Sequence, residues 1–509
     1  MTCVSSAAQD GVPAGLNNDT GKDLLSMLQQ LQSRFTWELK KEDLKLDDLS
    51  KQLQHDIDVE LGEPGTVAHY YRFLAYVRYL QGWPKKAETL LSQSEQKTIE
   101  CYGEDSELRL IVTYGDLAWL KYHRGLYTQS QSYYKRVQDI LVKYPVDSST
   151  DLHPEVYGEK AWTYLKLSKS YYSKAIDCFR RALELQPDKY EWNKGYAIAL
   201  YRTEEVLSIS QQTQTITEES PATKQLRLAL EINPDDAILL SMLALMLLYY
   251  QKPQEAEGLV ERALEIGPDD SQVIRYVAKY LRKQDHLDTS IRLLKTILEK
   301  NSQSAFIHHQ LALCYKEKKD KLLKLRPKPE REVQHWRRLC ISHLEEALRL
   351  KSTLNHTKAM LVLGYAEEYD IGRAREMFTE VLEKVEQEPD NIRQFIYRCC
   401  AEFCHYHILQ RDRAVTYYTK GLQISATTSE GKRCMRKLEL IAGQRLQDNH
   451  RDAAAHGILG AVAKAKGELK RAVENYENAL ENDTNNDGYL SALGELLQEL
   501  KLYDDHRGS

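Results

Sequence analysis

Residues that interrupt regular structure are scarce in this chain. Its 509 residues include only 13 prolines and 24 glycines, which leaves few points at which a helix has to end. Phenylalanine is also rare, with 7 residues against 32 tyrosines, so bulky positions are often filled by rings that carry a polar tip. Both features favour long helices with partly wetted, amphipathic faces.

The chain also lacks an excess of positive charge. Its formal net charge is −5, so no field of the whole molecule attracts nucleic acid. Any site for an anion must therefore be a local concentration of lysine and arginine.

Disulfide, secretory and membrane signals are missing too. The nine cysteines form no framework spacing, which favours a reducing compartment. Residues 1–23 have neither a basic start nor an apolar core, so they predict a disordered tail rather than a signal peptide. The longest apolar stretch, 237–250, is too short to cross a bilayer and suits a buried helix. We expect a cytoplasmic protein without a membrane partner.

What the chain does have is an internal repeat. Alanine-leucine pairs precede turns, and the spacing from Ala229 to Ala263 is 263 − 229 = 34 residues. From Ala263 to Ile297 it is again 297 − 263 = 34 residues. This is the tetratricopeptide period, in which each unit is a pair of helices. A single pair leaves an apolar edge that only a neighbouring pair covers, so the units must stack. We predict an all-α superhelical solenoid of about nine repeats.

Composition divides the chain further. We expect a helical N-terminal subdomain at 24–147, a central repeat array at 154–350 and a C-terminal repeat subdomain at 355–504. The polar stretch 207–223 predicts a loop. Residues 316–338 contain ten Lys or Arg and four Asp or Glu, so they form an insertion of net charge 10 − 4 = +6 inside one repeat.

Repeat register predicts which side chains line the concave face. With Ala278 and Ala312 at position 8 of their repeats, the groove positions of two adjacent units carry cationic or titratable groups: Arg275, Lys279, Arg282, His309 and Lys316. Tyrosines at 276, 280 and 315 are interleaved with them. Cations and rings together suit phosphates and stacked bases, although a peptide groove uses the same chemistry.

Several local motifs resemble the interferon-induced proteins with tetratricopeptide repeats, and the resemblance extends over nearly the whole chain. The motifs are Phe35-Thr36-Trp37-Glu38-Leu39, Leu74-Ala75-Tyr76-Val77, Ala118-Trp119, Gly195-Tyr196-Ala197-Ile198, Arg275-Tyr276, His308-His309-Gln310 and Cys314-Tyr315-Lys316. The resemblance implies a solenoid curled around a basic channel, which takes the 5′ end of single-stranded RNA. That end is triphosphorylated or carries an incompletely methylated cap, and its capture blocks translation.

The resemblance also implies roles for single residues. Trp162 corresponds to the ring that stacks on the cap base, and Ile198 to an apolar wall beside it. The positions that correspond to groups around the 5′ phosphates and first nucleotides are Lys166, Tyr172 and Arg202. Those that correspond to contacts with the RNA backbone and leading nucleotides are Arg275, His309 and Gln310.

Four positions depart from this pattern. Gln52 and Asp56 stand where cap-binding members have an arginine and a glutamine that face the triphosphate. Ile238 and Gln272 stand where RNA-contacting members have tyrosines. Because a carboxylate repels phosphates, Asp56 puts the preference for a 5′ triphosphate in question unless a metal ion intervenes or His55 or Lys51 compensates.

Tyr476 and Leu480 correspond to the Tyr-x-x-x-Leu segment through which family members associate. The same positions are the large residue and the leucine of the repeat itself, so a packing role is the alternative. The resemblance thus implies homo-oligomers, or hetero-oligomers with other family members.

Enzymatic and metal-binding signals are weak. Cys399, Cys400, Cys404, His405 and His407 have the composition of a zinc cluster but lack a second ligand pair at finger spacing. Because the sequence contains no phosphate loop or nucleophile motif, we expect neither catalysis nor a cofactor. The leading hypothesis is an RNA-binding antiviral effector. A peptide-binding scaffold and a subunit whose chemistry resides in a partner are the alternatives.

Overall fold

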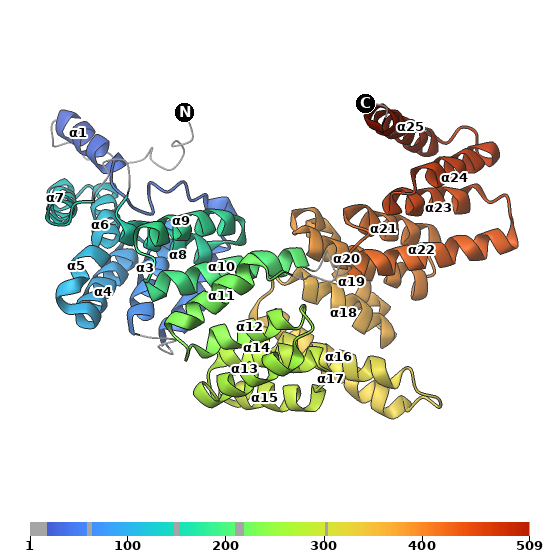
Figure 1. Ribbon diagram of the computed structural model, residues 1–509, viewed down its shortest axis with the longest axis horizontal. Helices are drawn as coiled ribbons and strands as arrows, with labels where there is room; N and C mark the ends of the chain where they lie inside the picture. Colours follow the sequence, from blue (N-terminus) through green and yellow to red (C-terminus); the bar gives the residue numbers. More distant parts are fainter. Residues whose placement is uncertain (1–17, 59–63, 147–151, 209–217, 301–303, 508–509) are drawn as a thin grey trace. The chain divides into compact units, whose positions relative to one another are not determined.

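The computed structural model describes residues 18–58, 64–146, 152–208, 218–300 and 304–507. Within these ranges every regular element is helical, as the repeat period predicts (Figure 1). The chain forms two compact units, the first made of 1–203 and 220–234 and the second of 204–219 and 235–509. The division falls inside the predicted central array 154–350.

The helices that belong mainly to the first unit are α1 (Asn18–Gln29), α2 (Leu46–Asp58), α3 (Pro64–Leu80), α4 (Pro84–Tyr102), α5 (Ser106–Arg109), α6 (Ile111–His123), α7 (Tyr127–Lys143), α8 (Pro154–Leu167), α9 (Tyr172–Leu185), α10 (Tyr190–Ser208) and α11 (Pro221–Ile232). Helix α1 begins at Asn18, so residues 18–23, the end of the predicted disordered tail 1–23, are helical. The rest of that tail, 1–17, lies outside the described residues.

The helices of the second unit are α12 (Ala237–Leu247), α13 (Pro253–Ile266), α14 (Ser271–Lys283), α15 (Leu287–Lys300), α16 (Ala305–Leu322), α17 (Glu330–Leu350), α18 (Asn355–Glu367), α19 (Ile371–Lys384), α20 (Asp390–Tyr406), α21 (Arg411–Ile424), α22 (Ser429–Asp448), α23 (Ala453–Lys466), α24 (Leu469–Asn482) and α25 (Asp487–Arg507). Short 3₁₀ helices occur at Lys41–Asp43, Gly103–Asp105, Lys169–Tyr171 and Val385–Gln387.

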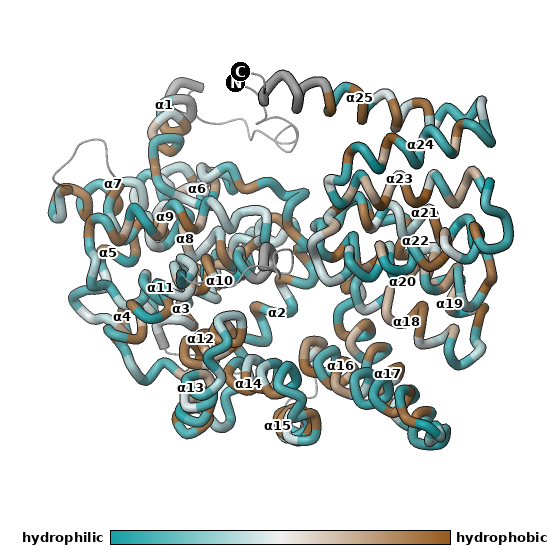
Figure 2. The backbone as a smooth tube through the Cα atoms, turned by 45° about the vertical axis from the view of Figure 1, so that its right-hand side comes forward, coloured by the Kyte–Doolittle hydropathy of each residue, from teal (hydrophilic) through white to brown (hydrophobic). Residues whose placement is uncertain are grey.

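Close helix crossings explain the small residues of the repeat. On α9, Ala175, Phe179 and Ala182 are fully buried. A Cβ atom at Gly195 on α10 would lie only 2.3 Å from the ring of Phe179, so a larger residue there would force the helices apart. Helix α12 is buried from Leu239 to Leu247 and is brown in Figure 2. The apolar stretch is therefore a core helix, as predicted.

The structure describes the two polar stretches to different extents. In the stretch 207–223, α10 continues to Ser208 and α11 begins at Pro221, while 209–217 lie outside the described residues. The basic insertion 316–338 instead lengthens α16 and α17, whose connection is 323–329. Among the described residues, no helix is both long and apolar enough to cross a membrane.

Candidate functional site

In the first unit, two neighbouring helices present predicted site residues one helical turn apart. Helix α8 carries Trp162 and Lys166, and α10 carries Ile198 and Arg202. Residues four apart share one face of a helix, and all four side chains are half-buried. The Arg202 Nη1 donates a hydrogen bond to the Leu165 carbonyl oxygen at 3.4 Å. The structure therefore brings these four predicted residues together.

Aromatic rings surround the cations of this group. The Lys166 Nζ lies 5.0 Å from the centre of the Tyr70 ring, and the Arg202 Cζ lies 6.0 Å from that of Tyr172. The Trp162 ring meets Phe179 edge to face, with centroids 5.5 Å apart. Its Nε1 is buried and has no hydrogen-bond partner among the described residues. Trp162 is thus packed on one side and partly exposed on another.

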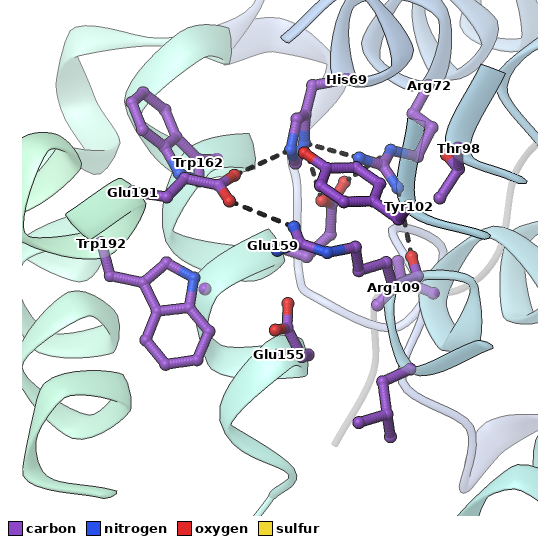
Figure 3. Close-up of a pocket in the computed structure, with 13 residues that line it drawn as sticks. His69, Arg72, Thr98, Tyr102, Arg109, Glu155, Glu159, Trp162, Glu191 and Trp192 are labelled. Atoms are coloured by element: carbon purple, nitrogen blue, oxygen red, sulfur yellow. Dashed lines mark hydrogen bonds and ion pairs between the residues drawn. The ribbon is translucent and has the colours of Figure 1, made fainter. Parts of the chain in front are cut away.

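A small cavity of about 10 Å³ lies beside Trp162, which is room for one water molecule. Figure 3 shows the charged groups that fill its surroundings. The His69 ring bridges two carboxylates, with Nδ1 2.9 Å from Glu159 and Nε2 3.0 Å from Glu191. Arg109 pairs with Glu191 at 3.1 Å, and the Arg72 Nε lies 3.3 Å from Glu159. A cavity of this volume is too small for a nucleotide base.

Both carboxylates are ionised, although Glu159 is buried and Glu191 is half-buried. Burial acts to raise the pKa of Glu191, but the hydrogen bond and charge of His69, together with Arg109, lower it to about 2. Burial acts in the same direction on Glu159, whose pKa Arg72, His69 and Arg34 hold well below its usual range. The two carboxylates near Trp162 are therefore ionised members of an ion-pair network, while Lys166 and Arg202 lie further along α8 and α10.

The two departures on α2 have different environments. Gln52 is exposed, whereas Asp56 is buried. Burial raises the pKa of Asp56, and the positive charges of Lys166 and His55 act in the opposite direction. Asp56 is thus close enough to Lys166 to interact with it electrostatically, so the departure affects a predicted phosphate-binding residue.

In the second unit, α14 presents a row of cations. The Arg275 Cζ lies 4.1 Å from the centre of the Phe306 ring and 5.1 Å from that of Tyr276. Burial, together with the charges of Lys283 and Arg282, lowers the pKa of Lys279 to about 7. Arg282 pairs with Glu317 on α16. An anion at this row relieves the repulsion among its cations.

His309 is a hydrogen-bonding group rather than a cation at neutral pH. Burial, followed by the charge of Arg282, lowers its pKa to about 4. Its Nδ1 lies 3.0 Å from the Thr357 hydroxyl, and its ring meets His356 with centroids 5.3 Å apart. Burial, followed by the charges of His309 and Arg398, lowers the pKa of His356 to about 3.

Gln310 and Lys316, the remaining predicted residues of α16, are less accessible to a ligand. Gln310 is buried, and its Oε1 has no partner among the described residues. Lys316 pairs with Asp320 at 2.5 Å. The interleaved tyrosines 276, 280 and 315 are only 6%, 5% and 1% exposed, so the expectation that they offer rings for stacking is wrong. They occupy the inner face of each helix, where they fill the core.

Sequence reasoning missed the charged network and the rings that complete both groups. The missed residues are His69, Arg72, Arg109, Glu159 and Glu191 in the first unit, and Phe306 and His356 in the second. Glu191 precedes Ile198 by seven residues on α10, so the helical period places both on one face. The helical period could therefore have identified Glu191 from the sequence. It could not identify its partner His69, which lies 122 residues earlier in the chain.

The other sequence signals have structural explanations. No group of three metal-binding side chains exists among the residues that the structure describes, and Cys399, Cys400 and Cys404 are buried. Tyr476 is 7% exposed, and its ring lies only 2.9 Å from the position that a Cβ atom at Gly460 would take. Leu480 is half-buried. The role of the last pair in association stays a prediction.

Comparison with known proteins gives matches over most of the chain. Residues 154–189 match the tetratricopeptide repeat family. Protein IFIT1 homolog B of Homo sapiens is 31% identical over 468 residues, which cover 90% of this chain and 97% of that protein. Interferon-induced protein with tetratricopeptide repeats 2 of Homo sapiens is 29% identical over 477 residues, covering 92% and 97%.

Solved structures agree with these relatives. The human IFIT1 dimer with m7Gppp-AAAA matches with a TM-score of 0.77 at 27% identity, covering 90% of this chain and 99% of that one. The human IFIT1 dimer with PPP-AAAA matches with a TM-score of 0.74 over the same shares of the two chains, again at 27% identity.

Proposed function

This chain belongs to the family of interferon-induced proteins with tetratricopeptide repeats, and from this premise we propose that it is a cytoplasmic, non-enzymatic antiviral effector. It binds the 5′ end of single-stranded RNA, either triphosphorylated or capped, in a basic channel of the solenoid and withholds that RNA from translation. It associates with copies of itself or with other family members.

The observation that carries the proposal is the group on α8 and α10. A half-buried Trp162 and two cations, Lys166 and Arg202, lie on adjoining turns of neighbouring helices. An indole face accepts any base, and each stacked base contributes about 1–3 kcal/mol. Lysine and arginine beside it neutralise phosphates. A peptide groove needs no such stacking ring.

The cations near Trp162 suit the phosphates that follow a cap. Glu159 and Glu191 also lie near the ring and are ionised, but each already pairs with arginine and histidine, so neither leaves an unbalanced negative charge for the positively charged N7-methylated guanine. The phosphates that follow the cap are negative, and the cations of α8 and α10 lie further along the same helices. Entry of a base requires the small cavity beside Trp162 to open.

The second unit supplies contacts for the nucleotides that follow. Arg275 and Lys279 on α14 are candidates for phosphate contacts, and neutral His309 for a hydrogen bond to a base or ribose. The repulsion that lowers the pKa of Lys279 is relieved when an RNA phosphate binds nearby.

A double variant tests the proposal. We expect Arg202→Glu with Arg275→Glu to weaken binding of a 5′-triphosphate single-stranded RNA by roughly a hundredfold, since both charges are reversed at phosphate sites. Fluorescence anisotropy measures the dissociation constant. The control is Arg180→Glu with Arg292→Glu, which reverses one exposed arginine in each unit. Equal loss in both variants, or no binding by the wild type at low salt, contradicts the proposal.

A further inference from the structure

The hairpin of α16 and α17 is longer than its neighbours. These helices have 18 and 21 residues, against 13 or 14 in α14, α15, α18 and α19. Their connection, 323–329, lies at the outer end of the hairpin, yellow in Figure 1. The extra length comes from the basic insertion 316–338, to which the proposed 5′-end site assigns no role beyond Lys316.

Cations at the base of the hairpin differ from those at its outer end. At the base, Lys318 pairs with Asp288 at 2.5 Å, and Lys319 with Glu367 at 2.6 Å. We define the hairpin tip by four exposed cations: Lys324, Arg326, Lys328 and Arg331. Within the described residues no carboxylate forms an ion pair with any of the four, although other cations of the insertion are paired.

The chemistry of the tip favours a phosphate backbone. Protein interfaces depend on buried aromatic or arginine anchors in apolar pockets, but the one large exposed apolar residue here is Leu325, at 52%. Exposed ammonium and guanidinium groups match phosphate oxygens instead. The connection has no aromatic ring for base stacking, so contacts at the tip are independent of sequence.

We propose that the hairpin tip is a second RNA contact, which binds phosphates of the strand downstream of the captured 5′ end. This inference rests on the proposed function. Within the second unit, helix α16 connects the tip with His309, the proposed contact for the leading nucleotides, because it carries His309 near its start and ends beside the tip. From His309 to Leu322 is 322 − 309 = 13 residues, or about 20 Å at 1.5 Å per residue.

That separation sets the length of RNA that reaches the tip. With an axial rise of about 3.4 Å per nucleotide along a stacked strand, 20 Å corresponds to about six nucleotides beyond those at His309. A four-nucleotide RNA held at the 5′-end site is therefore too short, whereas a twenty-nucleotide RNA spans the distance. Length dependence distinguishes the tip from the 5′-end site.

The test removes the four tip charges with Lys324→Ala, Arg326→Ala, Lys328→Ala and Arg331→Ala. The matched control removes four exposed cations from α15 and α19 of the same unit: Arg292→Ala, Lys295→Ala, Arg375→Ala and Lys384→Ala. Dissociation constants are measured over a salt series with 5′-triphosphate RNAs of four and twenty nucleotides. Circular dichroism verifies that both variants are folded.

We expect the tip variant to bind the twenty-nucleotide RNA at least about tenfold more weakly. Its slope of log affinity against log salt should fall by about 2 to 3, because each phosphate contact in a single strand contributes about 0.7. Binding of the four-nucleotide RNA should be unchanged. A wild-type slope in the tip variant, or the same loss in the control, overturns the inference.

A twenty-nucleotide RNA with a 5′ hydroxyl separates this inference from the proposed function. If the wild type shows no preference for a 5′ end, the proposed function fails. The tip variant still tests the second contact with the hydroxyl RNA: a reduced salt slope supports it, and an unchanged slope contradicts it.

Discussion

At the scale of single residues, Asp56 is the main electrostatic obstacle to a 5′ triphosphate. It is buried on α2, and it acts on Lys166, the lysine that the family resemblance assigns to the phosphates. An ionised carboxylate at this point cancels part of the attraction that Lys166 exerts on phosphate. Under the proposed function, the preference of this chain for a 5′ triphosphate therefore depends on Asp56, a position at which the resemblance gives cap-binding members a glutamine.

We predict that Asp56→Asn increases the preference for a 5′ triphosphate over a 5′ hydroxyl. The expected change in the ratio of dissociation constants is roughly tenfold, or about 1.4 kcal/mol. Fluorescence anisotropy with the two RNAs measures it. Asp58→Asn, on the exposed face of the same helix, is the control. An unchanged ratio in Asp56→Asn means that the carboxylate does not face the phosphates.

Under the proposed function, we expect Lys279 to make RNA binding dependent on pH. Its pKa in the free protein is about 7 because of burial and neighbouring cations, and a bound phosphate raises it. The complex therefore takes up a proton, and affinity falls as the pH rises above 7. By the same linkage, the free energy of unfolding rises with pH between about 7 and the unfolded pKa near 10.4.

We predict that the logarithm of the association constant for RNA declines between pH 7 and 8.5. Because one proton is taken up, its slope against pH is no steeper than −1. Lys279→Arg should flatten this part of the profile, since arginine stays charged. Lys283→Arg on the same helix should leave it as in the wild type. If Lys279→Arg keeps the wild-type slope, a group other than Lys279 titrates.

At the scale of the helices, a buried charge network holds α8 in place. Arg34 is fully buried and pairs with Asp116 on α6 at 2.5 Å and with Glu159 on α8. Glu159 also contacts Arg72 and His69 on α3. Because Trp162 and Lys166 follow on the same helix, the network positions the candidate 5′-end site.

We predict that Glu159→Gln lowers the free energy of unfolding of the first unit by about 3–5 kcal/mol, because it leaves buried arginines without full compensation. Five of the six tryptophans lie in this unit, so urea unfolding followed by tryptophan fluorescence reports on it. Glu184→Gln breaks an exposed pair with Arg181 and should cost at most about 1 kcal/mol. Similar costs in both variants would rule out the network as a structural anchor.

The helices themselves were largely predictable from the sequence. Ala229 and Ala263 mark the repeat, and both are fully buried on the second helices of their pairs. The spacing works because close crossing tolerates only small side chains at those positions. The basic insertion was visible as a charge excess, but its form as a helical extension was not, because charge alone specifies no backbone conformation.

At the scale of the whole molecule, long-range pairing was the main feature that the sequence did not reveal. His69 and Glu191 are separated by 122 residues of chain, and Arg34 and Glu159 by 125, so no local period connects them. Repeat register placed Arg275 and His309 on neighbouring helices. The tyrosines that it placed beside them in the groove, at 276, 280 and 315, are instead buried. Tyrosine suits both a wet groove and a core, and only packing decides between the two.

The net charge of −5 makes any attraction for RNA a local property of these residues rather than of the molecule. The most direct measurement is the dissociation constant of the wild type for one four-nucleotide RNA carrying a 5′ triphosphate, a cap or a 5′ hydroxyl, at fixed salt. A 5′-end binder holds the triphosphate or the capped form at least about tenfold more tightly than the hydroxyl form, a difference of about 1.4 kcal/mol. Equal dissociation constants for all three would contradict the central claim.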